Sequence, residues 1–145
     1  MERETLKREE ITGDFSPAGG EVKLKDTTRV FHDDSGHRVE ALSPINLTIK
    51  PGELVSLVGP SGCGKSTLLR LIAGLDIPDS GNLSIDGQPI EGTHHERGLV
   101  FQDPTLFPWL TVEKNIAFGF AARGIYHRSS EKVKKFISLV GLDGF

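Results

Sequence analysis

Residues 54–67 read LVSLVGPSGCGKST, and this stretch decides which fold the sequence predicts. Residues 54–58 are apolar on both faces of an extended strand, which is typical of a strand covered from both sides in a parallel sheet. A glycine-rich loop follows, and residues 65–75 are rich in helix-forming side chains. Strand, loop and helix in this order predict an α/β fold built around a parallel sheet.

The loop matches the pattern G-x-x-x-x-G-K-[ST] in full. Glycines let the backbone wrap closely around an anion and point its N–H groups inward, and the following helix adds its positive N-terminal end. In such a loop the lysine reaches the β and γ phosphates and the serine hydroxyl binds Mg²⁺. The alternative is a plain glycine-rich turn with a solvated lysine. The predicted nucleotide-binding residues are Gly59, Pro60, Ser61, Gly62, Cys63, Gly64, Lys65, Ser66 and Thr67.

Composition limits the possible partners. The chain has 145 residues, of which 17 are basic and 20 acidic, so its formal net charge is −3. Such a balance offers no basic field for a nucleic acid or an anionic bilayer. A single cysteine excludes an internal disulfide and a CxxC metal framework. We expect one domain over residues 21–145, preceded by a disordered tail over residues 1–20 that lacks the apolar core of a secretory signal.

Several β elements are expected around the central stretch. Residues 22–31 contain alternating strand-like segments, residues 33–36 (DDSG) form a turn, and apolar residues alternate over 45–49. Asp86-Gly87 between two short apolar segments predicts a tight hairpin. Residues 98–101 are a further strand candidate.

Two helices are expected near the end of the chain. The Thr111 hydroxyl can cap a helix that runs to about Ala122. A last helix is predicted over residues 130–140. Its apolar residues recur on one face: Val133, Phe136, Ile137 and Val140.

Three separated segments resemble the ATP-binding subunits of ABC transporters. They are residues 41–53 leading into GPSGCGKSTLLRLIAGL, residues 78–87 with PDSG and IDG, and residues 98–119 (GLVFQDPTLFPWLTVEKNIAFG). The resemblance covers the chain from about residue 21 and implies a P-loop NTPase fold, with a RecA-like core and an antiparallel β subdomain. The proline and tryptophan at 108 and 109 look most like the ATPases of nitrate, sulfonate and taurine importers.

The resemblance also implies roles for two residues outside the loop. Gln102 matches the Q-loop glutamine that contacts Mg²⁺ near the γ-phosphate; the alternative is a solvated polar residue at a strand end. Phe31 falls where the family stacks an aromatic ring on adenine, with Val39 as a possible flank, and stacking needs only a flat π face. The rival interpretation of Phe31 is a core aromatic on an early strand.

The segment that begins at Asp103 and ends at Leu110 holds two prolines and two large aromatics, Phe107 and Trp109. In the family this region faces the membrane permease subunits, and tryptophan is frequent among the residues that dominate binding. The alternative is that both rings pack under the following helix. The resemblance further implies a head-to-tail dimer with a second ATP-binding subunit, an indirect link to a periplasmic or extracellular solute-binding protein, and a place on the cytoplasmic face of the membrane.

The sequence also departs from the family. It contains no L-S-G-G-Q segment, no Walker B aspartate with its adjacent glutamate, and no later switch histidine. We therefore expect the amino-terminal, C-terminally truncated part of an ABC ATPase, with no catalytic residue in this chain. The alternative to a working ATPase subunit is a fragment that binds nucleotide without hydrolysing it. A GTPase or small-molecule kinase is disfavoured because no N-K-x-D segment is present.

Other reactive side chains carry weaker signals. Cys63 has no assignable histidine or asparagine partner, so a catalytic cysteine is disfavoured. His94-His95-Glu96 is better interpreted as a solvated loop than as a metal site, because adjacent loop residues do not converge as helical ligands do. Lysines near the end of the chain fit the wet face of the last helix: Lys132, Lys134 and Lys135.

Overall fold

The computed structural model describes residues 19–103 and 105–144, except for the side chains of residues 127 and 128. The chain divides into two compact units, one up to Leu99 and one from Val100 onward, and each is described here by itself. Residues 1–18 of the predicted tail lie outside the described residues.

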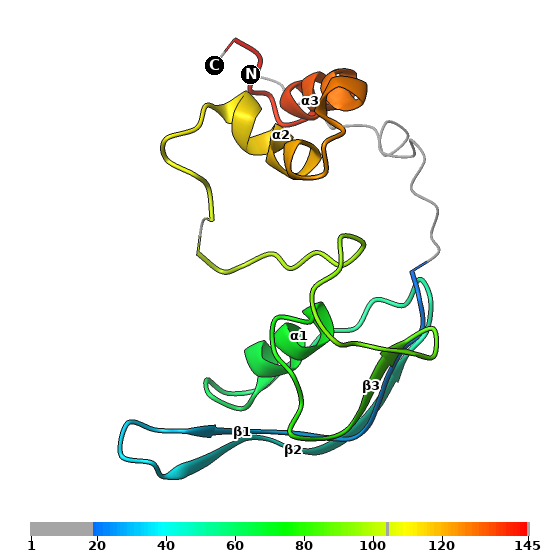
Figure 1. The fold of residues 1–145 in the computed structure, drawn as a ribbon, viewed down its shortest axis with the longest axis vertical. Helices are drawn as coiled ribbons and strands as arrows, with labels where there is room; N and C mark the ends of the chain where they lie inside the picture. Colours follow the sequence, from blue (N-terminus) through cyan, green and yellow to red (C-terminus); the bar gives the residue numbers. More distant parts are fainter. Residues whose placement is uncertain (1–18, 104, 145) are drawn as a thin grey trace, which may run out of the picture. The chain divides into compact units, whose positions relative to one another are not determined.

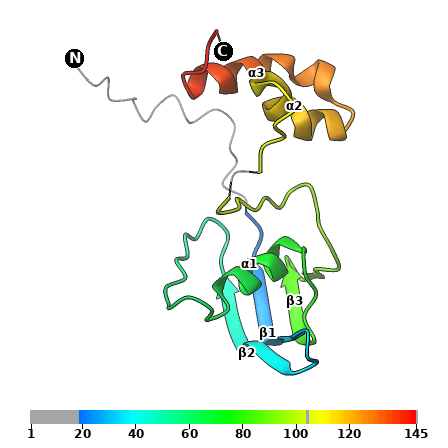
Figure 2. The same cartoon turned by 90° about the vertical axis from the view of Figure 1, so that its left-hand side faces the viewer.

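The first unit is an antiparallel sheet with one helix. Its strands are β1 (Val22–His32), β2 (Arg38–Ile49), β3 (Ser80–Ile85) and β4 (Gln88–Pro89), in the order β2-β1-β3-β4. The helix α1 (Lys65–Ala73) lies across one face of the sheet (Figures 1 and 2). This sheet is the antiparallel β part that the family resemblance implies.

The predicted turn at residues 33–36 and the predicted hairpin at Asp86-Gly87 are both confirmed. In the first, the Asp33 carboxylate accepts the backbone N–H of Ser35 at 2.9 Å and that of His37 at 2.8 Å. In the second, Asp86 and Gly87 adopt φ angles of 50° and 75°, the positive values that a two-residue turn of type I′ requires. The turn brings Ile85 opposite Gln88 and so aligns β3 with β4.

The core of this unit forms where α1 covers the sheet. Leu68 and Leu71, three residues apart on α1, are 3% and 0% exposed. On β1, Leu24 pairs with Leu47 of β2 on one side and with Leu83 of β3 on the other. The buried cluster comprises Leu24, Leu42, Leu68, Leu71, Leu83 and Ile90. This packing anchors the helix whose first residue follows the glycine-rich loop.

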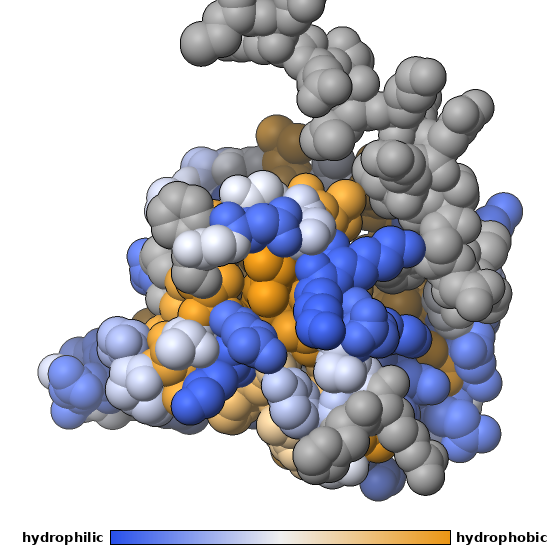
Figure 3. Space-filling view, turned by 90° about the horizontal axis from the view of Figure 1, so that it is seen from above, coloured by the Kyte–Doolittle hydropathy of each residue, from blue (hydrophilic) through white to orange (hydrophobic). Residues whose placement is uncertain are grey.

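Two predicted strands are wrong. Residues 54–58 and 98–101 adopt no strand in the structure, and Leu54 and Val58 are both 94% exposed. A parallel strand that is apolar on both faces needs neighbours on each side, and the four described strands pair only with one another. Residues 54–58 therefore have the apolar sequence of a buried strand but lack the hydrogen-bonded neighbours that a strand requires. The space-filling view of Figure 3 shows hydrophobic atoms among hydrophilic ones on the surface.

The second unit packs α2 (Val112–Ala122) against α3 (Tyr126–Leu139). The Thr111 hydroxyl caps α2 as predicted and accepts the backbone N–H of Lys114 at 3.2 Å. None of the described helices is long and apolar enough to cross a membrane.

The last helix begins four residues earlier than predicted, at Tyr126 instead of residue 130. Gly124, with φ 68°, reverses the chain directly after α2. Ser129 and Val133, one turn apart, are 6% and 1% exposed, so the buried face extends toward the start of the helix. Phe136 and Val140 belong to the predicted apolar face, yet they are 38% and 60% exposed.

Candidate phosphate-binding site

The glycine-rich loop leads directly into α1, as the motif requires. Gly64 is the N-cap residue of α1, with φ 90° and ψ 0°, and no side chain caps the helix. The first helical hydrogen bond runs from the N–H of Leu68 to the carbonyl of Gly64, at 2.9 Å. The N–H groups of residues 65–67 precede that bond and have no partner within the helix. They are the donors that a bound anion would use.

Gly64 is required on two grounds. Its φ of 90° is one that other residues rarely adopt, and a Cβ added there would come 2.5 Å from the backbone carbonyl oxygen of Ala41 in β2. The motif alone suggests only the first ground. The contact with Ala41 fixes the start of α1 against the sheet, so the loop is held at a definite point along β2.

Lys65 folds back over the loop. Its ammonium donates hydrogen bonds to the carbonyl oxygens of Gly59 at 2.9 Å and Pro60 at 2.6 Å. The same ammonium lies 3.4 Å from the Cys63 sulfur. These partners place the positive charge on the loop itself. Phosphate oxygens are ionised acceptors and form stronger hydrogen bonds than neutral carbonyls, so an anion in the loop would compete effectively for this ammonium.

Most of the remaining loop residues are exposed to solvent. The side chain of Cys63 is exposed, and its sulfur lies against Gly59, where an added Cβ would approach it to 2.7 Å. The Ser66 side chain is exposed at the start of α1, and its hydroxyl oxygen is a hard donor of the kind Mg²⁺ prefers. Pro60, Ser61 and Gly62 form the exposed outer part of the loop, and Thr67 is half-buried behind it.

Phe31 lies near the end of β1 and is 38% exposed, so it is not part of the core. It pairs across the sheet with Val39, and Ala41 lies two residues further along β2. Two residues of strand span about 7 Å. Since Gly64 contacts the backbone of Ala41, β2 meets Phe31 of β1 and the end of the phosphate loop at points only two residues apart.

The structure contains an ion-pair cluster beside Phe31, formed by Arg29, Asp76 and Asp79, which the sequence did not predict. The Arg29 guanidinium lies over the Phe31 ring, 4.7 Å from its centroid. It pairs with Asp76 at 2.7 Å and with Asp79 at 3.3 Å. The backbone N–H of Val30 bonds the Asp79 carboxylate and, with Arg29, holds the pKa of that carboxyl below its usual range. The sequence analysis singled out residues 78–81 (PDSG), which include Asp79, but the spacing of this segment does not indicate that Asp79 pairs with Arg29.

Gln102 belongs to the second unit, where its side chain is exposed.

In the same unit Phe107 is half-buried and packs against Phe118 of α2, with ring centroids 4.4 Å apart. Trp109, by contrast, is 76% exposed. The packing alternative therefore describes Phe107, whereas Trp109 presents its ring to solvent.

Asn115 fastens the segment that carries these aromatics. Its side-chain oxygen accepts the N–H of Phe107 at 2.8 Å. Its amide nitrogen donates to three carbonyl oxygens at 3.1 Å each, those of Phe107, Leu110 and Thr111. Sequence analysis missed this residue, because an asparagine within a helix gives no signal of bonding to the preceding loop.

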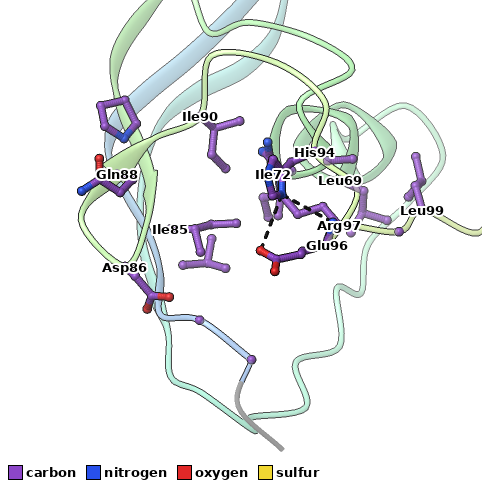
Figure 4. A pocket seen from close by; sticks show the side chains of 16 residues that line it. Leu69, Ile72, Ile85, Asp86, Gln88, Ile90, His94, Glu96, Arg97 and Leu99 are labelled. Carbon is purple, nitrogen blue, oxygen red and sulfur yellow. Dashed lines mark hydrogen bonds and ion pairs between the residues drawn. The ribbon is translucent and has the colours of Figure 1, made fainter. Parts of the chain in front are cut away.

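A cavity of about 830 Å³ in the first unit lies apart from the phosphate loop (Figure 4). It lies between α1 and the β3–β4 hairpin, with Ile72, Ile85 and Ile90 among its lining residues. No residue of the loop 59–64 lines it. At its rim His94 lies 3.6 Å from Glu96, and Arg97 donates to the carbonyl oxygens of Ile72 and Gly92.

Known proteins resemble the chain in both sequence and structure. The ABC transporter family matches residues 42–145. An uncharacterized ABC transporter ATP-binding protein of Methanocaldococcus jannaschii is 48% identical over 86% of this chain and 46% of its own length. The nitrate import ATP-binding protein NrtD of Synechocystis is 46% identical over 86% of this chain and 47% of its own. The taurine import ATP-binding protein TauB of Pelagibacter ubique is 44% identical over 80% and 44%.

A solved ATP-binding cassette, dimeric in a post-hydrolysis state with ADP and Pi bound, is similar with a TM-score of 0.64. It is 34% identical, and the match covers 76% of this chain and 54% of that one. The chain spans about half the length of the curated relatives it matches. Family match, relatives and fold agree with the geometry of the loop: the chain belongs to the ABC transporter family, with the sequence and the P-loop NTPase fold of its ATP-binding subunits.

Proposed function

We propose that this chain supplies the phosphate-binding half of an ATP site that energises an ABC importer. The observation that carries the proposal is the position of Lys65, whose ammonium lies on the carbonyls of Gly59 and Pro60 next to the uncapped start of α1. Backbone N–H groups, the helix end and one ammonium together form a positive cup that suits a triphosphate.

Each site residue has one task in this proposal. The backbone of residues 59–64 wraps around the β and γ phosphates. The Lys65 ammonium neutralises part of the negative charge on these two phosphates. Ser66 and Gln102 are the residues proposed to hold Mg²⁺, which, when bound, would screen the negative charge of the phosphates. Phe31 stacks on the adenine, which is consistent with its exposure and with its place on β1 opposite Val39, two residues before the Ala41 that Gly64 contacts.

The proposed partners follow from the family and from the exposed surface of the second unit. Residues 103–110 contact a membrane permease subunit, with the exposed Trp109 as an anchor. A second ATP-binding subunit completes the γ-phosphate site, and the assembly works at the cytoplasmic face of the membrane with an extracytoplasmic solute-binding protein. Import proteins for nitrate, sulfonates and taurine are among the relatives, so small oxyanions are the proposed class of solute.

A second candidate function is nucleotide binding without hydrolysis by the 145-residue chain. It is favoured by the sequence, in which no L-S-G-G-Q or Walker B segment is present. Phosphoryl transfer depends on positioning the attacking water and on a complete metal shell, and this chain offers no proposed base for that water.

Alkylation of Cys63 tests the phosphate site directly. The thiol is exposed and lies 3.4 Å from the Lys65 ammonium, so a triphosphate in the loop would cover it. We expect Mg·ATP to slow the labelling of Cys63 in the parent chain and to have no such effect in Lys65→Ala. Each variant is compared with its own nucleotide-free rate, which cancels any change in intrinsic reactivity. Equal labelling of the parent with and without Mg·ATP refutes the assignment.

A further inference from the structure

The structure gives the exposed ring of Phe31 a fixed partner on one side. The guanidinium of Arg29 lies over the ring, with its central carbon 4.7 Å from the centroid. A cation within about 6 Å of a ring centroid is attracted by the negative face of the π system. One face of Phe31 is therefore occupied from within the chain, while the ring remains 38% exposed.

Arg29 itself is held from its other side. Its two terminal nitrogens pair with separate carboxylates, that of Asp76 at 2.7 Å and that of Asp79 at 3.3 Å. The side chains of Arg29 and Asp76 are only 22% and 12% exposed, so this pair is well shielded from solvent. Ion pairs of this kind restrict a long side chain far more than an exposed single pair does.

One of the two acidic partners, Asp79, is in turn bonded to the backbone of the strand that carries Phe31. The Asp79 carboxylate accepts the backbone N–H of Val30 at 2.7 Å, and the N–H of Asp79 donates to the carbonyl of Thr28 at 3.0 Å. Strand β1 and the turn after α1 thus lock together around Arg29. The guanidinium cannot leave the ring without breaking bonds to both acids.

We propose that Arg29 is a positioning residue for the base of the nucleotide: clamped by Asp76 and Asp79, it holds the Phe31 ring so that the opposite face stacks on a purine. The inference rests on the proposed function, because it assigns a role within the same ATP site. Arg29 touches the ring and not the nucleotide, and its effect on binding passes through Phe31.

Comparison of ATP with inorganic tripolyphosphate separates base from phosphate recognition. Titrations with each ligand and Mg²⁺ are made on the parent chain, Arg29→Gln, Phe31→Ala and the double variant. We expect Arg29→Gln to weaken ATP binding about two- to fivefold, the range of an exposed cation–π contact, and to leave tripolyphosphate affinity unchanged. In the Phe31→Ala background, Arg29→Gln should cause no additional loss.

The outcomes distinguish this inference from the proposed function. Equal losses for ATP and tripolyphosphate, or a loss that persists without the Phe31 ring, overturn the positioning role of Arg29. An unchanged ATP affinity in Phe31→Ala, with tripolyphosphate still bound, also overturns it but leaves the phosphate site intact. If the parent binds neither ligand, the proposed function itself fails.

A second variant guards against misfolding. Arg29→Lys keeps a positive charge near Asp76 and Asp79 but removes the flat guanidinium that covers the ring. Should Arg29→Gln fail to fold, Arg29→Lys is expected to show the same selective loss of ATP affinity. Parent-like binding of both ligands by Arg29→Lys would overturn the proposal.

Discussion

Gly64 meets two structural requirements at once, one set by the turn of the loop and one set by its close packing against the sheet. A positive φ turns the chain into α1, and the lack of a side chain admits the carbonyl of Ala41. Lys65 is the next residue, so the contact between Gly64 and Ala41 also fixes where the backbone of Lys65 lies. The position of the Lys65 ammonium therefore depends on the packing of the loop against β2.

The Asp79 carboxylate should titrate at unusually low pH. The Val30 N–H and Arg29 lower its pKa, so the folded-state value lies below the unfolded one. Its contribution to stability is therefore present above the unfolded pKa and lost as pH falls through the folded pKa. We expect the Val30 amide resonance to shift with a midpoint below about 3.9, the usual aspartate value, in an NMR pH titration. Asp79→Asn should abolish that shift, whereas a midpoint at or above the usual value would contradict the account.

Residues that act through a motif could be predicted from sequence, and those that act through a fold contact could not. Lys65 and its neighbours stand in a pattern whose chemistry is known from spacing alone. Arg29 pairs with Asp76 and Asp79, about fifty residues away, and only the register of β1 against β3 brings them together. The ring of Phe31 left two interpretations open, and its exposure argues against the core one.

At the scale of elements, Asn115 shows how a helix can shape the loop before it. Four hydrogen bonds from this side chain reach residues 107, 110 and 111. They hold the backbone of the proposed docking segment itself, at Phe107 and Leu110, while Trp109 stays exposed.

Asn115→Ala should loosen that loop without unfolding α2. Each hydrogen bond contributes about 0.5–1.5 kcal/mol net, so we expect the Phe107 amide to exchange its hydrogen at least about tenfold faster. Asn115→Asp is the matched control, because it keeps an acceptor for the Phe107 N–H and removes only the amide donors. Unchanged exchange at Phe107 in Asn115→Ala would show that the loop is held by other contacts.

Elements set by local chemistry were predicted well. The turn at Asp86-Gly87, the cap at Thr111 and the amphipathic α1 depend on residues close in sequence. Residues 54–58 were predicted as a strand from hydrophobicity, but a strand also needs a partner. The hydrophobic pattern indicates which residues could be buried in a sheet. It does not indicate whether a neighbouring strand is present to pair with them.

At the scale of the whole molecule, the two units divide the proposed tasks. The first, up to Leu99, holds the phosphate loop, Phe31 and Arg29; the second, from Val100, holds Gln102 and the proposed permease surface. Nucleotide binding should therefore depend mainly on the first unit, whereas coupling to a partner should depend on the second.

The 145-residue chain on its own should hydrolyse no ATP beyond background. Binding by the loop leaves the attacking water without a positioned base, since no Walker B segment is present in the sequence. Phosphate release by the purified parent chain should equal that of Lys65→Ala over the same protein concentrations. Turnover in the parent alone would contradict this expectation.

Calorimetric titration of the chain with Mg·ATP tests the central claim, that the loop before α1 binds a triphosphate. We predict a saturable heat of binding for the parent chain and none for Lys65→Ala at the same concentrations. A folded parent chain that gives no binding heat, or a Lys65→Ala variant that binds as tightly as the parent, would contradict it.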